Sequence, residues 1–159
     1  MREKITVLIA DDNQEFSMTL ATYLKNQEDM VVVGRAKDGN EALDMIPNLM
    51  PDVVLLDVIM PHLDGIGVLE KLNTEGKNVT CIMLSAVGQD NVTAQAINLG
   101  AQSYILKPFK MDVLMKRIRE LIEKPEQPKP VIKLPTKENE IVVEENFITK
   151  KVNEEEKSI

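Results

Sequence analysis

Apolar runs and stretches with helical periodicity alternate five times along this chain, and that alternation limits the fold more than any other feature. Apolar residues recur at helical spacing between the runs, as Phe16, Leu20 and Leu24 do. Strands buried on both faces of a parallel sheet are almost wholly apolar. The pattern therefore predicts an α/β fold, a (βα)5 doubly wound parallel sheet. Its strands are expected at residues 5–10, 30–33, 53–56, 79–84 and 103–106.

Local signals predict where the helices begin and end. Gly39 opens the second helical stretch, and Pro47 should end or bend it because proline lacks a backbone N–H. Gly76 and Gly100 are well placed to terminate the third and fourth helices. Right-handed crossovers place helices on both faces of the sheet. We expect the flavodoxin-like strand order 2-1-3-4-5, in which the ends of the first and third strands are neighbours.

Composition excludes several functional classes. The net charge is −7 over 159 residues, and no dense basic cluster is present to displace counterions from a nucleic acid. No apolar run approaches membrane-spanning length, and the apolar stretch that begins at Ile5 is too short for a signal peptide. Cys81 is the only cysteine and lies in an apolar run, which indicates a core residue and a reducing compartment. We expect a cytoplasmic protein without a membrane partner.

The composition changes after Glu123. Four prolines lie among lysine, glutamate and glutamine between positions 125 and 135, a pattern typical of a semi-extended linker. The sequence therefore predicts a domain at residues 1–124 and a linker or disordered tail at residues 125–159. As an alternative, the short apolar patches at 141–143 and 147–148 pair with a sheet edge or a partner.

Five polar residues fall at or just beyond the carboxyl ends of predicted strands. In a parallel sheet these ends share one edge, so three carboxylates, a hydroxyl and an ammonium group should converge there. Clustered carboxylates repel one another and favour a hard cation, while a lysine beside them can balance an incoming phosphate. The pattern predicts a divalent-cation and phosphoryl-transfer site. Its residues are Asp11, Asp12, Asp57, Ser85 and Lys107.

These residues also carry a family resemblance. Over residues 4–123 the chain resembles the receiver domains of bacterial two-component response regulators. Three stretches, 10–13, 60–69 and 89–109, resemble more narrowly the receivers of the stage 0 sporulation regulators, phosphorelay-controlled transcription factors of spore-forming bacteria. In that family a linker leads to a DNA-binding domain, so we expect an absent output domain or a stand-alone regulator. The resemblance rests on Asp11-Asp12, Asp57 to Pro61 with Asp64-Gly65, Ser85-Ala86, Tyr104 and Lys107-Pro108.

The resemblance implies a role for each site residue. Asp57 would be the nucleophile that accepts a phosphoryl group, which makes the chain a phosphoacceptor switch and not an ordinary enzyme. Asp11, Asp12, Asp57 and the backbone carbonyl of Ile59 would hold Mg²⁺, for which Ca²⁺ or Mn²⁺ can substitute. Lys107, next to a cis peptide bond at Pro108, would pair with a phosphate oxygen. Ser85 would donate its hydroxyl to the phosphoryl group, and Tyr104 would follow by turning inward.

The resemblance also implies partners. The donor would be a histidine kinase or a histidine phosphotransferase, and phosphorylation can lead to a homodimer. We expect the donor to dock on residues that flank the acidic crevice, namely Gln14, Phe16, Pro108 and Phe109. Ile59 and Val87 occupy the positions at which family members tune hydrolysis of the aspartyl phosphate. Neither side chain can hydrogen-bond a water, so the sequence predicts a long-lived phosphoryl group.

Other interpretations fit parts of the pattern. Asp12 taken alone is as consistent with a helix N-cap as with a metal ligand, and His62 is better explained as an exposed loop residue than as a phosphoryl relay. A flavodoxin-like flavin carrier shares the topology, but adjacent aspartates repel a flavin phosphate. A haloacid-dehalogenase-type phosphatase wants a second aspartate where Ile59 stands. A pseudo-receiver that binds partners without phosphorylation is the remaining alternative.

Overall fold

The computed structural model describes residues 3–86 and 90–123, which lie in one compact unit, Met1–Lys124. Five strands and five helices alternate along these residues, as the periodicity predicts. The strands are β1 (Ile5–Ala10), β2 (Met30–Ala36), β3 (Val53–Asp57), β4 (Thr80–Ala86) and β5 (Ser103–Lys107). The helices are α1 (Gln14–Lys25), α2 (Gly39–Leu49), α3 (Gly65–Thr74), α4 (Asp90–Asn98) and α5 (Met111–Glu123).

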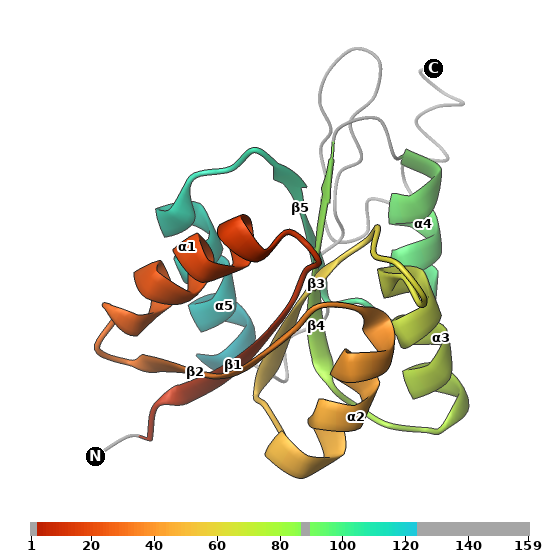
Figure 1. Cartoon of the computed structure of the whole chain (residues 1–159), viewed down its shortest axis with the longest axis horizontal. Helices are drawn as coiled ribbons and strands as arrows, with labels where there is room; N and C mark the ends of the chain where they lie inside the picture. The colour runs from red at the N-terminus through yellow and green to blue at the C-terminus, as the bar shows by residue number, and fades with distance from the viewer. Residues whose placement is uncertain (1–2, 87–89, 124–159) are drawn as a thin grey trace, which may run out of the picture. The chain divides into compact units, whose positions relative to one another are not determined.

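All neighbouring strands are parallel and form one sheet in the order β2-β1-β3-β4-β5, which confirms the expected topology. Helices α1 and α5 cover one face of this sheet, and α2, α3 and α4 cover the other (Figure 1). The sheet therefore lies between two helical layers, and most residues of its central strands are buried. Val53 to Leu56 of β3, for example, are 0% exposed. Burial on both faces explains why these strands are continuously apolar.

The core beneath α1 and α5 is built from strand and helix residues of the whole domain. Ile9, Leu55 and Leu84 from three strands pack with Leu20 of α1 and Leu114 of α5. Burial in such apolar surroundings raises the pKa of the Cys81 thiol to about 12, which agrees with its expected role as a core residue. None of the helices in the described part of the chain combines the length and the apolar content needed to span a bilayer.

The sequence predicts that Pro47 ends or bends α2, and the structure shows that the helix does not end at Pro47. The helix continues to Leu49, and it ends where Met50 adopts a left-handed conformation with φ 45°. The backbone N–H of Met50 still donates to Ile46 at 2.8 Å. A proline lacks one backbone N–H and so removes one helical hydrogen bond. In the last turn this loss matters little, because the chain leaves the helix soon afterwards. Gly76 and Gly100 do follow α3 and α4 with positive φ, as predicted.

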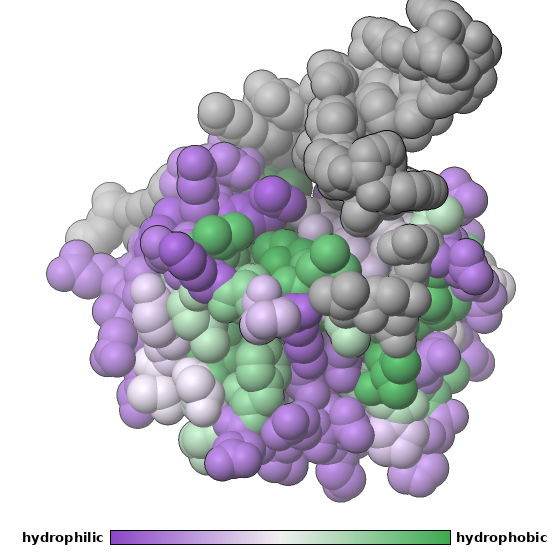
Figure 2. Space-filling view, turned by 90° about the horizontal axis from the view of Figure 1, so that it is seen from above, coloured by the Kyte–Doolittle hydropathy of each residue, from purple (hydrophilic) through white to green (hydrophobic). Residues whose placement is uncertain are grey.

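Hydrophobic residues gather in the middle of the face seen from above, with hydrophilic residues around them (Figure 2). This is the side on which the β5–α5 connection lies at the top of Figure 1. The carboxyl ends of the strands point to the same side (Figure 1).

Candidate functional site

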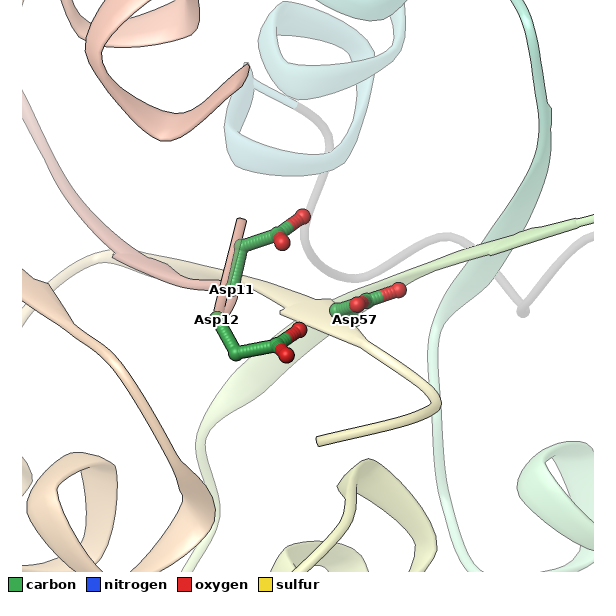
Figure 3. Close-up of side chains that lie close together, drawn as sticks. All are labelled: Asp11, Asp12 and Asp57. Carbon is green, nitrogen blue, oxygen red and sulfur yellow. The ribbon is translucent and has the colours of Figure 1, made fainter. Parts of the chain in front are cut away.

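Asp11, Asp12 and Asp57 come together at the carboxyl edge of the sheet. The first two follow β1 and the third ends β3, which pairs directly with β1. One carboxylate oxygen from each residue lies within 4.8 Å of the others. Their carboxylate groups face a common space (Figure 3). Adjacent strands thus bring together three acidic groups that lie far apart in the sequence.

The three aspartates differ in burial. Asp11 is fully buried, the Asp57 side chain is 13% exposed, and Asp12 is exposed to solvent. Asp11 also accepts a hydrogen bond from the backbone N–H of Asn13 at 2.9 Å. Asn13 is the N-cap of α1, because its side chain accepts from the backbone N–H of Phe16. The N-cap interpretation of Asp12 is therefore wrong, and Asp12 is left to face the crevice.

Lys107 joins this acidic group from the end of β5. Its Nζ lies 3.1 Å from Oδ2 of Asp11 and 3.4 Å from Oδ1 of Asp57. The peptide bond between Lys107 and Pro108 is cis, as the resemblance implies. One ammonium group thus lies between two carboxylates at a strand end, where it can also meet an incoming anion.

The environment of Asp57 raises the pKa of its carboxyl group. Burial, followed by the nearby negative charge of Asp11, raises the pKa of Asp57 from 3.8 to about 6, and Lys107 opposes part of this rise. A carboxyl group that is costly to ionise gains from any cation placed beside it. All the donors here are oxygens, which are the ligands that Mg²⁺, Ca²⁺ and Mn²⁺ prefer. The residues present therefore fit a hard divalent cation.

We predict that Mg²⁺ binding weakens as the pH falls through about 6. Below its pKa of about 6, Asp57 is protonated, and a proton must leave before the metal can bind. The apparent affinity should then fall about tenfold for each further pH unit. Calorimetric titration of the full chain with MgCl₂ at a series of pH values measures this. The Asp57→Asn variant should bind more weakly and lose this pH dependence, whereas a wild-type affinity that stays constant across pH 6 would contradict the prediction.

Ser85 and Tyr104 lie on the two strands at the other end of the sheet. Ser85 is fully buried near the end of β4, and its hydroxyl contacts the backbone carbonyl of Ala86 at 3.3 Å. Tyr104 on β5 pairs with Met83 of β4 and is 8% exposed. Within the described residues the buried Tyr104 hydroxyl has no hydrogen-bond partner. Tyr104 is therefore already turned inward in this structure.

The four residues expected to dock a partner lie on α1 and on the connection after β5, next to residues of the acidic group. Gln14 begins α1 and donates from its side chain to the backbone carbonyl of Asp11 at 3.3 Å. The rings of Phe16 and Phe109 meet edge to face, with their centroids 6.1 Å apart. Pro108 is exposed beside them. Phe16, Pro108 and Phe109 thus place apolar side chains next to the charged end of Lys107.

The connection between β3 and α3 carries two further residues of interest. Ile59 is 60% exposed. Val87, which follows β4, lies outside the described residues. His62 is 69% exposed, as expected for a loop residue, but its Nδ1 also lies 3.0 Å from Oδ2 of Asp38. Asp38 is the N-cap of α2, so this contact ties the loop after Asp57 to a second helix.

Two contacts at the site were not visible in the sequence. One is the Asp38–His62 pair, whose members are 24 positions apart. The other is the placement of the Lys107 Nζ over the Phe16 ring, 4.4 Å from its centroid. The sequence offered one indication of the Lys107–Phe16 contact. Phe16 is an aromatic residue in the first turn of α1, at the edge of the sheet where the strands end.

Comparison with known proteins agrees with this geometry. The family model of the response regulator receiver domain matches residues 7–119. The chain belongs to the response regulator receiver family. Receiver domains bind Mg²⁺ through an acidic pocket and interact with histidine kinases or phosphotransfer proteins. In this receiver, Asp11, Asp12 and Asp57 form an acidic group that could hold such an ion.

Solved receiver domains share the fold. The receiver domain of the Francisella response regulator 1452 is 31% identical with a TM-score of 0.71, and the match covers 77% of this chain and all of that one. The response regulator domain of Thermotoga maritima CheB is 32% identical with a TM-score of 0.70, over 76% and 98% of the two chains. The AraT receiver of Geobacillus stearothermophilus is 30% identical with a TM-score of 0.68, over 77% and 96%.

Proposed function

We propose that this receiver accepts a phosphoryl group on Asp57 in a reaction that depends on a divalent cation. The observation that carries the proposal is the placement of Lys107 between Asp11 and Asp57, at the mouth of a group of three carboxylates. Such a site combines a nucleophile, ligands for a hard cation and a positive charge for the incoming phosphate. The chain then acts as a switch that is set by phosphorylation of Asp57, and its own residues assist this phosphorylation.

Asp57 is the nucleophile in this proposal. With a pKa of about 6 it is ionised at neutral pH and needs no general base. One of its carboxylate oxygens forms a bond to phosphorus, and the bond from phosphorus to the donor breaks. The donor group, an imidazole of phosphohistidine or the carboxylate of an acyl phosphate, leaves with the electron pair. Asp57 differs from Asp11 because its side chain is partly exposed, which gives the donor access.

Asp11, Asp12 and Asp57 would hold Mg²⁺, together with the backbone carbonyl of Ile59. The bound ion supplies positive charge that offsets repulsion between Asp57 and the phosphoryl oxygens. Lys107 can exchange its contact with Asp57 for one with a phosphoryl oxygen without leaving Asp11. Ser85 would donate its hydroxyl to the phosphoryl group, and the inward Tyr104 would occupy the space beside it.

Acetyl phosphate tests the proposal without any partner protein. We expect the full chain, incubated with acetyl phosphate and MgCl₂, to gain the mass of one phosphoryl group in intact-mass spectrometry. The modification should disappear when a chelator is added before the donor, because the carboxylates then lack their cation. An unmodified protein, or a modification that resists the chelator, would favour a pseudo-receiver that only binds partners.

We predict that the aspartyl phosphate is long-lived. Hydrolysis needs a water held near phosphorus, and the exposed side chain of Ile59 cannot hydrogen-bond one. Decay of radiolabelled phosphoprotein should take minutes or longer, and loss within seconds would count against the prediction. An Ile59→Asn variant should lose its label several-fold faster, because an amide can position water, whereas an Ile59→Leu variant should match the wild type.

A protein donor is proposed to dock beside the crevice. Phe16, Pro108 and Phe109 offer apolar contact area near the charged site, and Gln14 contacts the backbone of Asp11. A helical phosphotransferase or the phosphoacceptor domain of a histidine kinase fits such a surface, because its histidine must reach a group that lies inside a crevice.

Phosphorylation is further proposed to control an output domain that binds DNA, and residues 125–159 to serve as the linker to it. The support is the proline pattern after Glu123 and the resemblance of residues 10–13, 60–69 and 89–109 to receivers of sporulation regulators. On the same grounds we propose a role in sporulation and a homodimer formed on phosphorylation. A flavin carrier is disfavoured, because Asp11 and Asp12 occupy the place where a flavin phosphate would bind.

A further inference from the structure

The ammonium group of Lys107 has a third neighbour besides its two carboxylates. The Phe16 ring lies beneath it, with 4.4 Å between Nζ and the ring centroid. A lysine side chain is long and flexible, and that of Lys107 is 26% exposed, so solvent competes for its charged end. The negative face of an aromatic ring attracts a cation at this distance. Phe16 therefore limits where the ammonium group can lie.

Phe16 is itself held from two sides. Its backbone N–H donates to the side chain of Asn13 at 3.0 Å, which fixes the first turn of α1. The Phe109 ring meets it edge to face, at an interplanar angle of 87°. Phe109 follows Lys107 by two positions, so the aromatic pair joins α1 to the connection that carries the lysine. The Phe16 ring is thus packed against Phe109 and against the hydrophobic core.

The ring offers something that the carboxylates cannot. Asp57 changes its charge and its size when it is phosphorylated, and Lys107 must then give up its contact with the free carboxylate. A neutral ring keeps the same attraction for the ammonium group before and after that change. Asp11 and Phe16 together would hold Lys107 in place while its third contact passes from Asp57 to the phosphoryl group.

We propose that Phe16 is a positioning residue for phosphoryl transfer, acting through Lys107, in addition to any part it has in docking. This inference rests on the function proposed above. A docking residue matters only when the donor is a protein, because a small donor makes no contact with the surface around the crevice. A residue that positions Lys107 matters for every donor. Small phosphoryl donors therefore separate the two roles.

The experiment measures phosphorylation of the full chain by intact mass, with acetyl phosphate and with phosphoramidate at saturating MgCl₂. Phe16→Leu should slow transfer from both donors by about threefold to tenfold at saturating donor, the range expected for one cation–π contact. Phe16→Tyr, which keeps the ring, should react like the wild type. Met18→Leu is the matched control on α1, since Met18 is 53% exposed and has no contact with Lys107 among the described residues.

A second measurement reports the contact directly. In the wild type the ε-methylene protons of Lys107 should show an upfield ring-current shift in the NMR spectrum. The shift should persist in Phe16→Tyr and vanish in Phe16→Leu. Trifluorophenylalanine introduced at position 16 keeps the shape of the ring but removes its negative face, so it should slow transfer as Phe16→Leu does, without affecting the fold.

The outcomes separate this inference from the proposed function. Wild-type rates with both small donors for Phe16→Leu and for the trifluorinated ring would overturn the positioning role. If the wild type itself accepts no phosphoryl group, the proposed function fails. In that case the NMR measurement still tests the contact between Lys107 and Phe16. No ring-current shift in the wild type would overturn this inference as well. A shift in the wild type that is lost in Phe16→Leu would support the contact, although the proposed function has failed.

Discussion

The Asp57→Asn variant is expected to accept no phosphoryl group from acetyl phosphate, because an amide is not a nucleophile under these conditions. The same change should make the metal-free fold more stable at neutral pH. Burial and the charge of Asp11 raise the pKa of Asp57 to about 6, against about 3.9 for an aspartate in an unfolded chain. The folded state therefore carries this negative charge at a cost, and the amide removes it.

The sign and the size of the effect follow from linkage. The cost is absent below about pH 4, where Asp57 is protonated in both states, and it is complete above about pH 6. Two pKa units correspond to about 3 kcal/mol, and partial solvent access reduces this to about 1 to 2 kcal/mol. Urea unfolding with a chelator present, at pH 7.5 and at acidic pH, measures the difference in free energy of unfolding.

Asp44→Asn is the matched control. Asp44 is exposed on α2, away from the strand ends, so its replacement should change neither phosphorylation nor stability by more than about 0.5 kcal/mol. If the Asp57→Asn variant is phosphorylated to the wild-type level, a residue other than Asp57 accepts the phosphoryl group. Equal stability of Asp57→Asn and wild type at pH 7.5 would show that burial of Asp57 carries no such cost.

Gly65→Ala is expected to destabilise the fold by about 2 to 3 kcal/mol, the range for inserting atoms into packed space. A Cβ at this position would lie 2.4 Å from the backbone carbonyl oxygen of Asp57 and 3.1 Å from Cα of Val58. Backbone atoms at the end of β3 cannot yield without moving the site. The backbone N–H of Gly65 also donates to Val58 at 2.9 Å, so the first turn of α3 cannot retreat without breaking that bond.

Gly67→Ala provides the comparison within the same turn of α3. Its Cβ would lie 2.4 Å from Cδ1 of Leu63, which is the far end of a flexible side chain. Leu63 can turn away, and alanine favours the helix over glycine by up to about 1 kcal/mol. We expect the free energy of unfolding, measured by urea titration, to change by less than about 1 kcal/mol. Equal losses for both variants would show that close approach to the backbone at Gly65 is not what the fold requires.

Much of the fold was predictable because the spacing of apolar residues in each segment reflects which faces of that segment are buried. The period of the apolar residues distinguishes strand from helix, and the first strand, Ile5–Ala10, appears in the structure at its predicted bounds. The end of α2 was less predictable: Pro47 was expected to end or bend this helix, and the helix continues through it to Leu49. A proline rule describes a helix interior, and whether a position is interior depends on where the chain turns away.

The sequence by itself determined that acidic residues stand at the ends of strands, and through the parallel topology that Asp11, Asp12 and Asp57 would share one edge. Only the tertiary structure decided which neighbours each charge has. It buried Asp57 enough to raise its pKa to about 6, and it placed the Lys107 ammonium over Phe16, 91 positions away. Periodicity is a property of one segment, whereas a pKa or a cation–π contact depends on distances between segments, and these distances exist only after the sheet and its helices have packed.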